Sequence, residues 1–196
     1  AGAYFYTYVL GDMKLMSGVS VIGLIASLVG IVMGPYLANR FGKKKVYLTA
    51  VIISTALNLL RLLDVTSMIL IYISALIGGV AGGWMVPVNT SIQADNTTYV
   101  QYKTGKRAEA AIASLTSFVS KVAQGLGGAI PGYVIAAYGF VTGASVQPES
   151  INTGIILCAL ILPLIFGILG LLIFGTQYTL DQKAVIEMDA KINRNN

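Results

Sequence analysis

The sequence predicts an all-α integral membrane protein, from its composition and from the spacing of its charges. Of the 196 residues, 56% are hydrophobic and only 11% are charged, with a mean hydropathy of +0.76. Soluble domains carry charge on about a quarter of their residues. Crossing a bilayer takes roughly 20 apolar helical residues. Uncharged stretches of 25, 30, 27 and 31 residues lie between Lys14 and Arg40, Asp64 and Asp95, Lys121 and Glu149, and Glu149 and Asp181.

The elements follow in order from these stretches. Residues 1–10 ("AGAYFYTYVL") are apolar and aromatic but too short to span, so they predict a first helix that is cut short. The first complete span is expected at 17–38, where the basic run "ANRFGKKK" closes it. A second span is expected at 46–63, ending just before Asp64. The segment that follows, 67–92, contains the glycine-rich "IGGVAGG", typical of membrane helices that pack closely.

Two more spans complete the prediction. One covers 108–138 and contains a lysine, Lys121, well inside the span. The other covers 151–175 and is the most continuously apolar part of the chain. The tail, 176–196, alternates charged residues with apolar ones at helical spacing, which indicates a short amphipathic helix lying on the membrane or on another domain.

The basic residues predict the orientation. Ten of the 13 Lys and Arg residues fall in alternate loops or in the tail, and this side is expected in the cytoplasm by the positive-inside rule. The opposite loops hold Lys14 and Arg61. The chain is therefore expected in the cell membrane (inner or plasma membrane), in contact with the lipid bilayer. Because the basic excess is a topology signal, nucleic-acid binding is not expected.

The residue inventory argues against an enzyme. The chain has no histidine and one cysteine, Cys158, so a disulfide framework and histidine-based metal or triad chemistry are excluded within it. Neither a phosphate-binding glycine loop nor a nucleophile motif is present. We expect no cofactor and no metal site.

Lys121 is the strongest candidate functional residue. A charged side chain at mid-membrane costs about 2.5–3.5 kcal/mol on insertion scales, so it should face an aqueous cavity or a carboxylate. Ser114, Ser117, Lys121 and Gln124 lie within about 80° on one helical face. This polar stripe predicts a substrate-binding surface. The alternative is a lysine that snorkels to the interface.

The span before it offers two further candidates, Trp84 and Asn89. A tryptophan in mid-membrane presents a flat apolar face and one N–H donor, which suits the C–H faces and hydroxyls of a sugar. The alternative for Trp84 is an interfacial aromatic residue. We expect both residues to line the same cavity as Lys121.

Residues 93–110, "QADNTTYVQYKTGKRAEA", form a charged hairpin between two apolar spans. This hairpin resembles the signature of the glycoside–pentoside–hexuronide cation symporters, a branch of the major facilitator superfamily. Thr98 and Gln101 replace two acids of that pattern. The matching residues are Ala94, Asp95, Tyr99, Lys103, Thr104, Gly105, Lys106, Arg107 and Glu109. The segments "YTYVLGD", "RFGKKK" and "YTLDQKAVIEMDAKI" extend the resemblance over nearly the whole chain.

The resemblance implies a fold and a function. The chain would be the C-terminal six-helix bundle of a twelve-helix carrier, with its first helix truncated and with the N-terminal half as its partner. The complete carrier would move a sugar or glycoside with sodium or a proton by alternating access. The cation site would lie on aspartates of the N-terminal half. Two alternatives remain: a major-facilitator carrier of a non-sugar solute, or a non-transporting membrane assembly subunit.

The hairpin itself is expected to act as a cytoplasmic gate. Lys103 and Arg107 are placed to pair with acids of the absent half, and Asp95 with Arg40 or the lysines beside it. Lys106 and Glu109 complete this charge network. The alternative is that these bases only anchor the topology.

Overall fold

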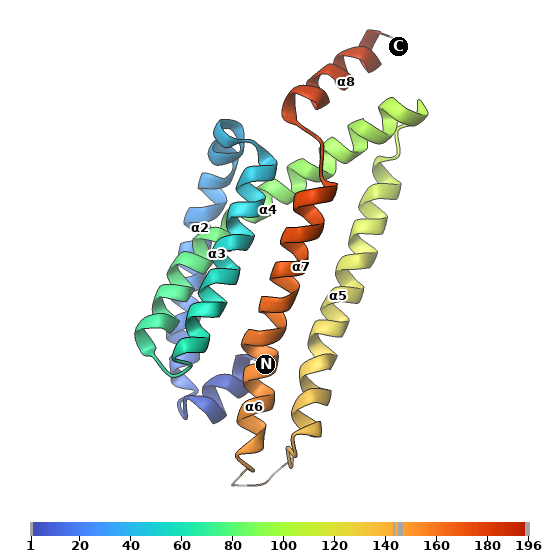
Figure 1. Ribbon diagram of the computed structural model, residues 1–196. Helices are drawn as coiled ribbons and strands as arrows, with labels where there is room; N and C mark the ends of the chain where they lie inside the picture. The colour runs from blue at the N-terminus through green and yellow to red at the C-terminus, as the bar shows by residue number, and fades with distance from the viewer. Residues whose placement is uncertain (1, 143, 145–146, 195–196) are drawn as a thin grey trace.

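The computed structural model describes residues 2–142, 144 and 147–194, and all the regular secondary structure in these ranges is helical (Figure 1). The all-α prediction is confirmed. Two segments have π-type hydrogen bonding: η1 directly follows α1, and η2 connects α6 to α7 without a break. The elements are α1 (Gly2–Tyr4), η1 (Phe5–Val9), α2 (Lys14–Phe41), α3 (Lys43–Leu63), α4 (Met68–Thr104), α5 (Glu109–Ala137), α6 (Ser150–Ile156), η2 (Leu157–Ile161), α7 (Leu162–Gln177) and α8 (Gln182–Arg194).

Four helical segments of the described chain are long and apolar enough to cross a membrane: α2, α3, α4 and the continuous helix Ser150–Gln177. The predicted span 108–138 corresponds to α5, which has 29 residues but is not among these four. Its length suffices, and its polar residues lower its hydropathy. The helix that carries Lys121 is thus a long helix of the described chain that falls outside the four spanning candidates.

Helices α2 and α4 form the closest pair in the structure, and glycines make this approach possible. A Cβ atom at Gly83 would collide with the Ser27 carbonyl, and one at Gly30 with the Val80 carbonyl. A Cβ at Gly79 would lie 2.7 Å from the Gly23 carbonyl oxygen. Such backbone contact gains van der Waals packing, which drives helix association in lipid. Of the glycines in the predicted packing segment, Gly79 and Gly83 lie against α2, whereas a Cβ at Gly82 would meet no atom within 4 Å.

The short N-terminal segment packs at the end of the bundle where α3 turns into α4. Phe5 of η1 is buried together with Ile71 of α4, Ile135 of α5, and Ile151 and Ile155 of α6. This cluster joins four elements that are distant in sequence. It holds α5 to α6 at the end where the N-terminus lies (Figure 1).

The hairpin expected at 93–110 is mostly helix, which corrects the sequence prediction. Helix α4 continues to Thr104, and only residues 105–108 separate it from α5. Neither glycine nor proline occurs between Gln93 and Thr104, so nothing in the sequence stops the helix. It ends at Gly105, which adopts the left-handed conformation (φ 70°) that favours glycine.

Helix α8 packs on the extension of α4 beyond the predicted span. Its apolar residues Val185, Met188 and Ile192 are half-buried, and α8 contacts α4 along its length. The Lys191 ammonium lies 5.8 Å from the centre of the Tyr102 ring. The prediction named the membrane or another domain as the support of this helix, and the structure adds a contact with α4 of the same bundle.

Candidate functional site

The polar stripe of α5 lies on an open surface. Ser114, Ser117, Lys121 and Gln124 are all exposed, as is every residue from 117 to 130. Among the described residues, none forms a hydrogen bond or ion pair with the Lys121 ammonium. The structure therefore presents the ammonium and its polar neighbours as an uncovered face.

Helix α5 stands apart from the bundle along its middle. It contacts α6 and α4, and Ile135 is its one buried residue among those described. Its glycines do not pack: a Cβ at Gly125, Gly127, Gly128 or Gly132 would meet no atom within 4 Å. Figure 1 shows α5 on the flank of the bundle, joined to it at both ends. Small residues on an uncovered helix leave room for another helix to approach closely.

Trp84 does not share this face, in contrast to the prediction that it lies with Lys121. Trp84 packs with the buried cluster of Ala38, Val46, Val88 and Ile92. It also lines a cavity of about 300 Å³ between α2 and α3.

The helical period explains the separation of the two predicted residues of α4. Trp84, Val88 and Ile92 follow one another every four residues and form the buried side of α4. Asn89 is five residues from Trp84, or about 140° around the helix, and is exposed. Asn89 therefore remains available to a ligand outside the bundle, whereas Trp84 is turned toward α2 and α3.

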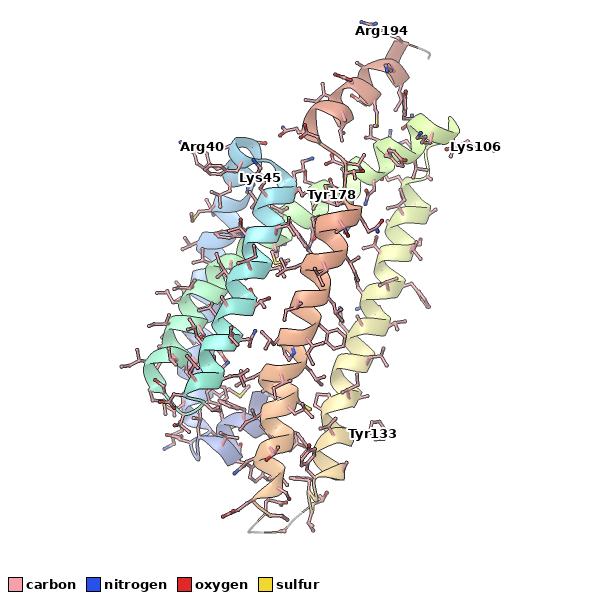
Figure 2. The ribbon with its side chains drawn as sticks, viewed as in Figure 1. Arg40, Lys45, Lys106, Tyr133, Tyr178 and Arg194 are labelled. Atoms are coloured by element: carbon pink, nitrogen blue, oxygen red, sulfur yellow. The ribbon has the colours of Figure 1, made fainter. Side chains whose placement is uncertain are left out.

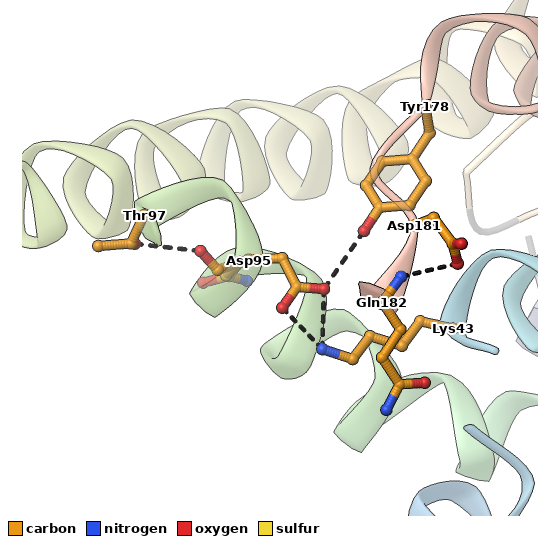
Figure 3. A network of polar contacts seen from close by, with 7 residues as sticks. Lys43, Asp95, Thr97, Tyr178, Asp181 and Gln182 are labelled. Atoms are coloured by element: carbon orange, nitrogen blue, oxygen red, sulfur yellow. Dashed lines mark hydrogen bonds and ion pairs between the residues drawn. The ribbon is translucent and has the colours of Figure 1, made fainter. Parts of the chain in front are cut away.

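A second site gathers around Asp95, the one charged residue that is buried among those described, with 5% of its surface exposed. Lys43, at the start of α3, places its ammonium 2.7 and 2.8 Å from the two carboxylate oxygens. The Tyr178 hydroxyl, just after α7, donates a hydrogen bond of 3.4 Å to the same carboxylate. Figure 3 shows these side chains converging from three helices. The cluster ties α3, α4 and the end of α7 together.

The Tyr178 phenol is held neutral at this site. Burial, and then the charge and hydrogen bond of Asp95, raise the pKa of Tyr178 to about 12. At physiological pH the phenol therefore keeps its proton and can donate it to the carboxylate. Donation to an ionised acceptor is stronger than a neutral hydrogen bond.

The other predicted gate residues have local partners or are exposed in this chain. The Arg40 guanidinium donates a hydrogen bond of 3.2 Å to the Tyr36 hydroxyl oxygen and does not pair with Asp95. Arg107 pairs with Glu109 of its own turn at 2.9 Å, and both side chains are largely exposed. The Lys103 ammonium lies 5.9 Å from the centre of the Tyr99 ring, and Lys106 is exposed.

Sequence reasoning named the lysines beside Arg40 as a group but did not single out Lys43, and it missed Tyr178. Lys43 could have been noted as the first residue after Gly42, whose positive φ of 88° turns the chain from α2 into α3. No local signal in the sequence indicates that Tyr178 reaches Asp95, because the two are 83 positions apart.

Comparison with known proteins identifies the family. The sequence profile of the family described as MFS/sugar transport protein matches residues 1–182. The chain belongs to this family. It is similar to the glucuronide carrier protein homolog of Escherichia coli (strain K12), with 31% identity over 96% of the chain. It is also similar to the uncharacterized symporter YjmB of Bacillus subtilis (strain 168), with 32% identity over 95% of the chain.

A third relative is the isoprimeverose transporter of Lactiplantibacillus pentosus, which is 28% identical over 76% of this chain and 31% of its own length. The chain spans 42% of the E. coli relative and 41% of the B. subtilis relative. All three are named as transporters, carriers or symporters rather than as enzymes. These findings confirm the predicted resemblance to sugar symporters, and they agree with a multi-pass membrane protein of the MFS/sugar transport family.

Proposed function

We propose that the complete protein carries a sugar or glycoside across the cell membrane together with sodium or a proton. In this proposal the chain described above is the C-terminal helical bundle, and an N-terminal bundle covers its open face. The match to the MFS/sugar transport family over residues 1–182 supports it. So do the names of the relatives, which include a glucuronide carrier homolog, an isoprimeverose transporter and a symporter.

The observation that carries the proposal is the uncovered Lys121 face of α5. An ammonium without a partner is costly at membrane depth, so this face is suited to a water-filled cavity between two bundles. The Ser114 and Ser117 hydroxyls and the Gln124 amide can exchange hydrogen bonds with sugar hydroxyls. The Lys121 ammonium can donate to a hydroxyl or a carboxylate of the substrate. Asn89 adds a second amide from α4.

The coupling cation is assigned to the N-terminal bundle. Sodium prefers oxygen ligands, and Asp95, the buried acid of the described chain, is occupied by Lys43. We therefore place the cation on acidic residues of the other half. Binding of substrate and cation at the interface of the two bundles would let both bias the same conformational change.

Transport measurements on the complete protein test this function. Vesicles containing the protein should accumulate a labelled β-glucuronide or isoprimeverose when an inward sodium or proton gradient is imposed. An ionophore that collapses the effective gradient should abolish accumulation. Exchange of labelled for unlabelled glycoside across the vesicle membrane, at equal concentrations on both sides, should persist. If neither gradient drives uptake of any member of a glycoside panel, sugar symport is contradicted.

The charged end of the bundle is the proposed gate, and we place it in the cytoplasm. Figure 2 shows Arg40, Lys45, Lys106 and Arg194 at one end of the molecule, with Tyr133 toward the other. The Lys43–Asp95 pair and Tyr178 would keep α3, α4 and α7 moving as one body. The exposed Arg107 would exchange its local partner Glu109 for an acid of the N-terminal bundle in the outward-facing state.

Replacing Arg107 with alanine should slow transport up to about fivefold with near-normal substrate affinity, because an exposed ion pair contributes at most about 1 kcal/mol. The inward-facing population should rise, as measured by distance-sensitive labels on the two bundles. Arg194→Ala is the matched control, since it removes one exposed positive charge from the same end of the molecule. If Arg107→Ala leaves rate, affinity and population at wild-type values, the hairpin is only a topology anchor.

A further inference from the structure

An apolar cavity lies between α2 and α3, near the basic end of the bundle. Its volume is about 300 Å³. Its polar lining residues are Thr49 and Lys45. The apolar lining comes from Met33, Leu37, Phe41, Val46 and Trp84. Met33 and Phe41 are eight residues apart on α2, so the lining extends for about 12 Å along the helix.

A second, more polar cavity adjoins the first. It has a volume of about 290 Å³, and Phe41 and Lys45 line both. The start of α3 contributes the consecutive residues Lys43, Lys44 and Lys45, and the segment after α7 contributes Tyr178 to Gln182. Figure 2 shows Lys45 at the same end of the molecule as Arg40 and Lys106. The apolar cavity therefore adjoins a lysine-lined cavity at the end of the spanning helices.

The charges of the polar cavity are not balanced. Lys43 is paired with Asp95, and the Asp181 carboxylate accepts a hydrogen bond of 2.7 Å from the Gln182 backbone N–H. Lys44 and Lys45 have no ion-pair partner among the described residues. With Asp181 counted against these two lysines, the lining retains a net positive charge. These lysines lie in the first turn of α3, which is the positive end of the helix dipole. That turn holds no acid to offset their charge.

We propose that the two cavities together bind one anionic phospholipid of the bilayer. The headgroup phosphate lies against the Lys44 and Lys45 ammonium groups, and an acyl chain extends along Phe41 and Met33 to Trp84. Basic pockets between membrane helices at the polar boundary are suited to anionic headgroups. The choice of an anionic lipid rests on charge complementarity with the lysine-lined cavity and on the apolar lining of the other cavity. A zwitterionic lipid would complement the apolar cavity but would leave the positive charge of the lysine-lined cavity unbalanced.

Fluorescence quenching tests the acyl-chain position in the complete protein. Trp84 is the single tryptophan of this chain, and it lines the apolar cavity. Phosphatidylglycerol with brominated acyl chains, added to the detergent-solubilised protein, should quench the Trp84 signal at lower concentration than brominated phosphatidylcholine does. The signal of Trp84→Phe, measured in parallel, is subtracted to isolate Trp84 from any other tryptophan. Equal quenching by the two lipids, or none, would overturn the proposal.

Two double variants, each lacking two positive charges, test the headgroup position. The double variant Lys44→Gln/Lys45→Gln should bind brominated phosphatidylglycerol about 25-fold more weakly, at roughly fivefold per lysine near the membrane surface. Its matched control, Lys106→Gln/Arg194→Gln, removes the same charge from exposed positions outside both cavities and should change binding less than twofold. All four side chains lie outside the buried core, so both variants should fold. An equal loss in the control would show non-specific attraction to the basic end and would overturn the site.

Discussion

Replacing Lys121 with alanine in the complete carrier should abolish substrate accumulation while leaving membrane insertion intact. The ammonium is uncovered on α5 and has no partner among the described residues, so its removal should leave the bundle itself unchanged. A hydrogen bond to a charged group contributes about 1.5–3 kcal/mol, so losing two of them would lower uptake by roughly 100-fold or more. Counterflow and gradient-driven uptake of the labelled glycoside measure the loss.

Lys121→Arg keeps the charge and should also fail, because a planar guanidinium presents its donors in a different geometry from a compact ammonium. Thr116→Ala is the matched control: it removes a polar side chain from the same helix, about 120° away from the centre of the polar stripe. It should transport normally. Wild-type uptake by Lys121→Ala would contradict the assignment of this face to the substrate.

Replacing Gly83 with alanine should prevent α2 and α4 from packing. The new Cβ would collide with the Ser27 backbone carbonyl, which cannot rotate away as a flexible side chain can. Overpacking of this kind costs about 1–3 kcal/mol, and a backbone collision belongs at the upper end of that range. The loss should be measurable as a lower thermal stability in detergent and a lower yield of folded protein.

Gly82 supplies the matched control for this prediction. A Cβ at Gly82 would meet no atom within 4 Å, so Gly82→Ala gains helix propensity without a collision. The control should therefore be as stable as the wild type or more so. If Gly83→Ala matches it, the close approach of the two helices is not a determinant of stability.

The candidate site was predictable in full only where it depends on one helix, and the partner of Asp95 was predicted only as Arg40 or one of the lysines beside it. The polar stripe from Ser114 to Gln124 follows from the helical period, and the structure shows all four of its residues exposed on α5. The pairing of Asp95 with Lys43 joins residues 52 positions apart, and the bond from Tyr178 joins residues 83 apart. The crossing of α2, α3 and α4 decides which of the neighbouring bases reaches Asp95, and no local pattern encodes that crossing.

By itself the sequence determined the helical class, the membrane setting and the positions of the long helices. It did so because a helix of about 20 apolar residues is long enough to cross the hydrocarbon core of a bilayer. The lengths of the uncharged runs therefore locate the spanning helices. The end of α4 was not among these predictions: the expected span stopped at 92, although neither glycine nor proline occurs between Gln93 and Gly105. The tertiary structure alone decided that α8 rests on α4 and that Trp84 faces α2 and α3. These contacts, like the approach of α2 to α4 at Gly30 and Gly83, join segments that are distant along the chain, and no local pattern encodes them.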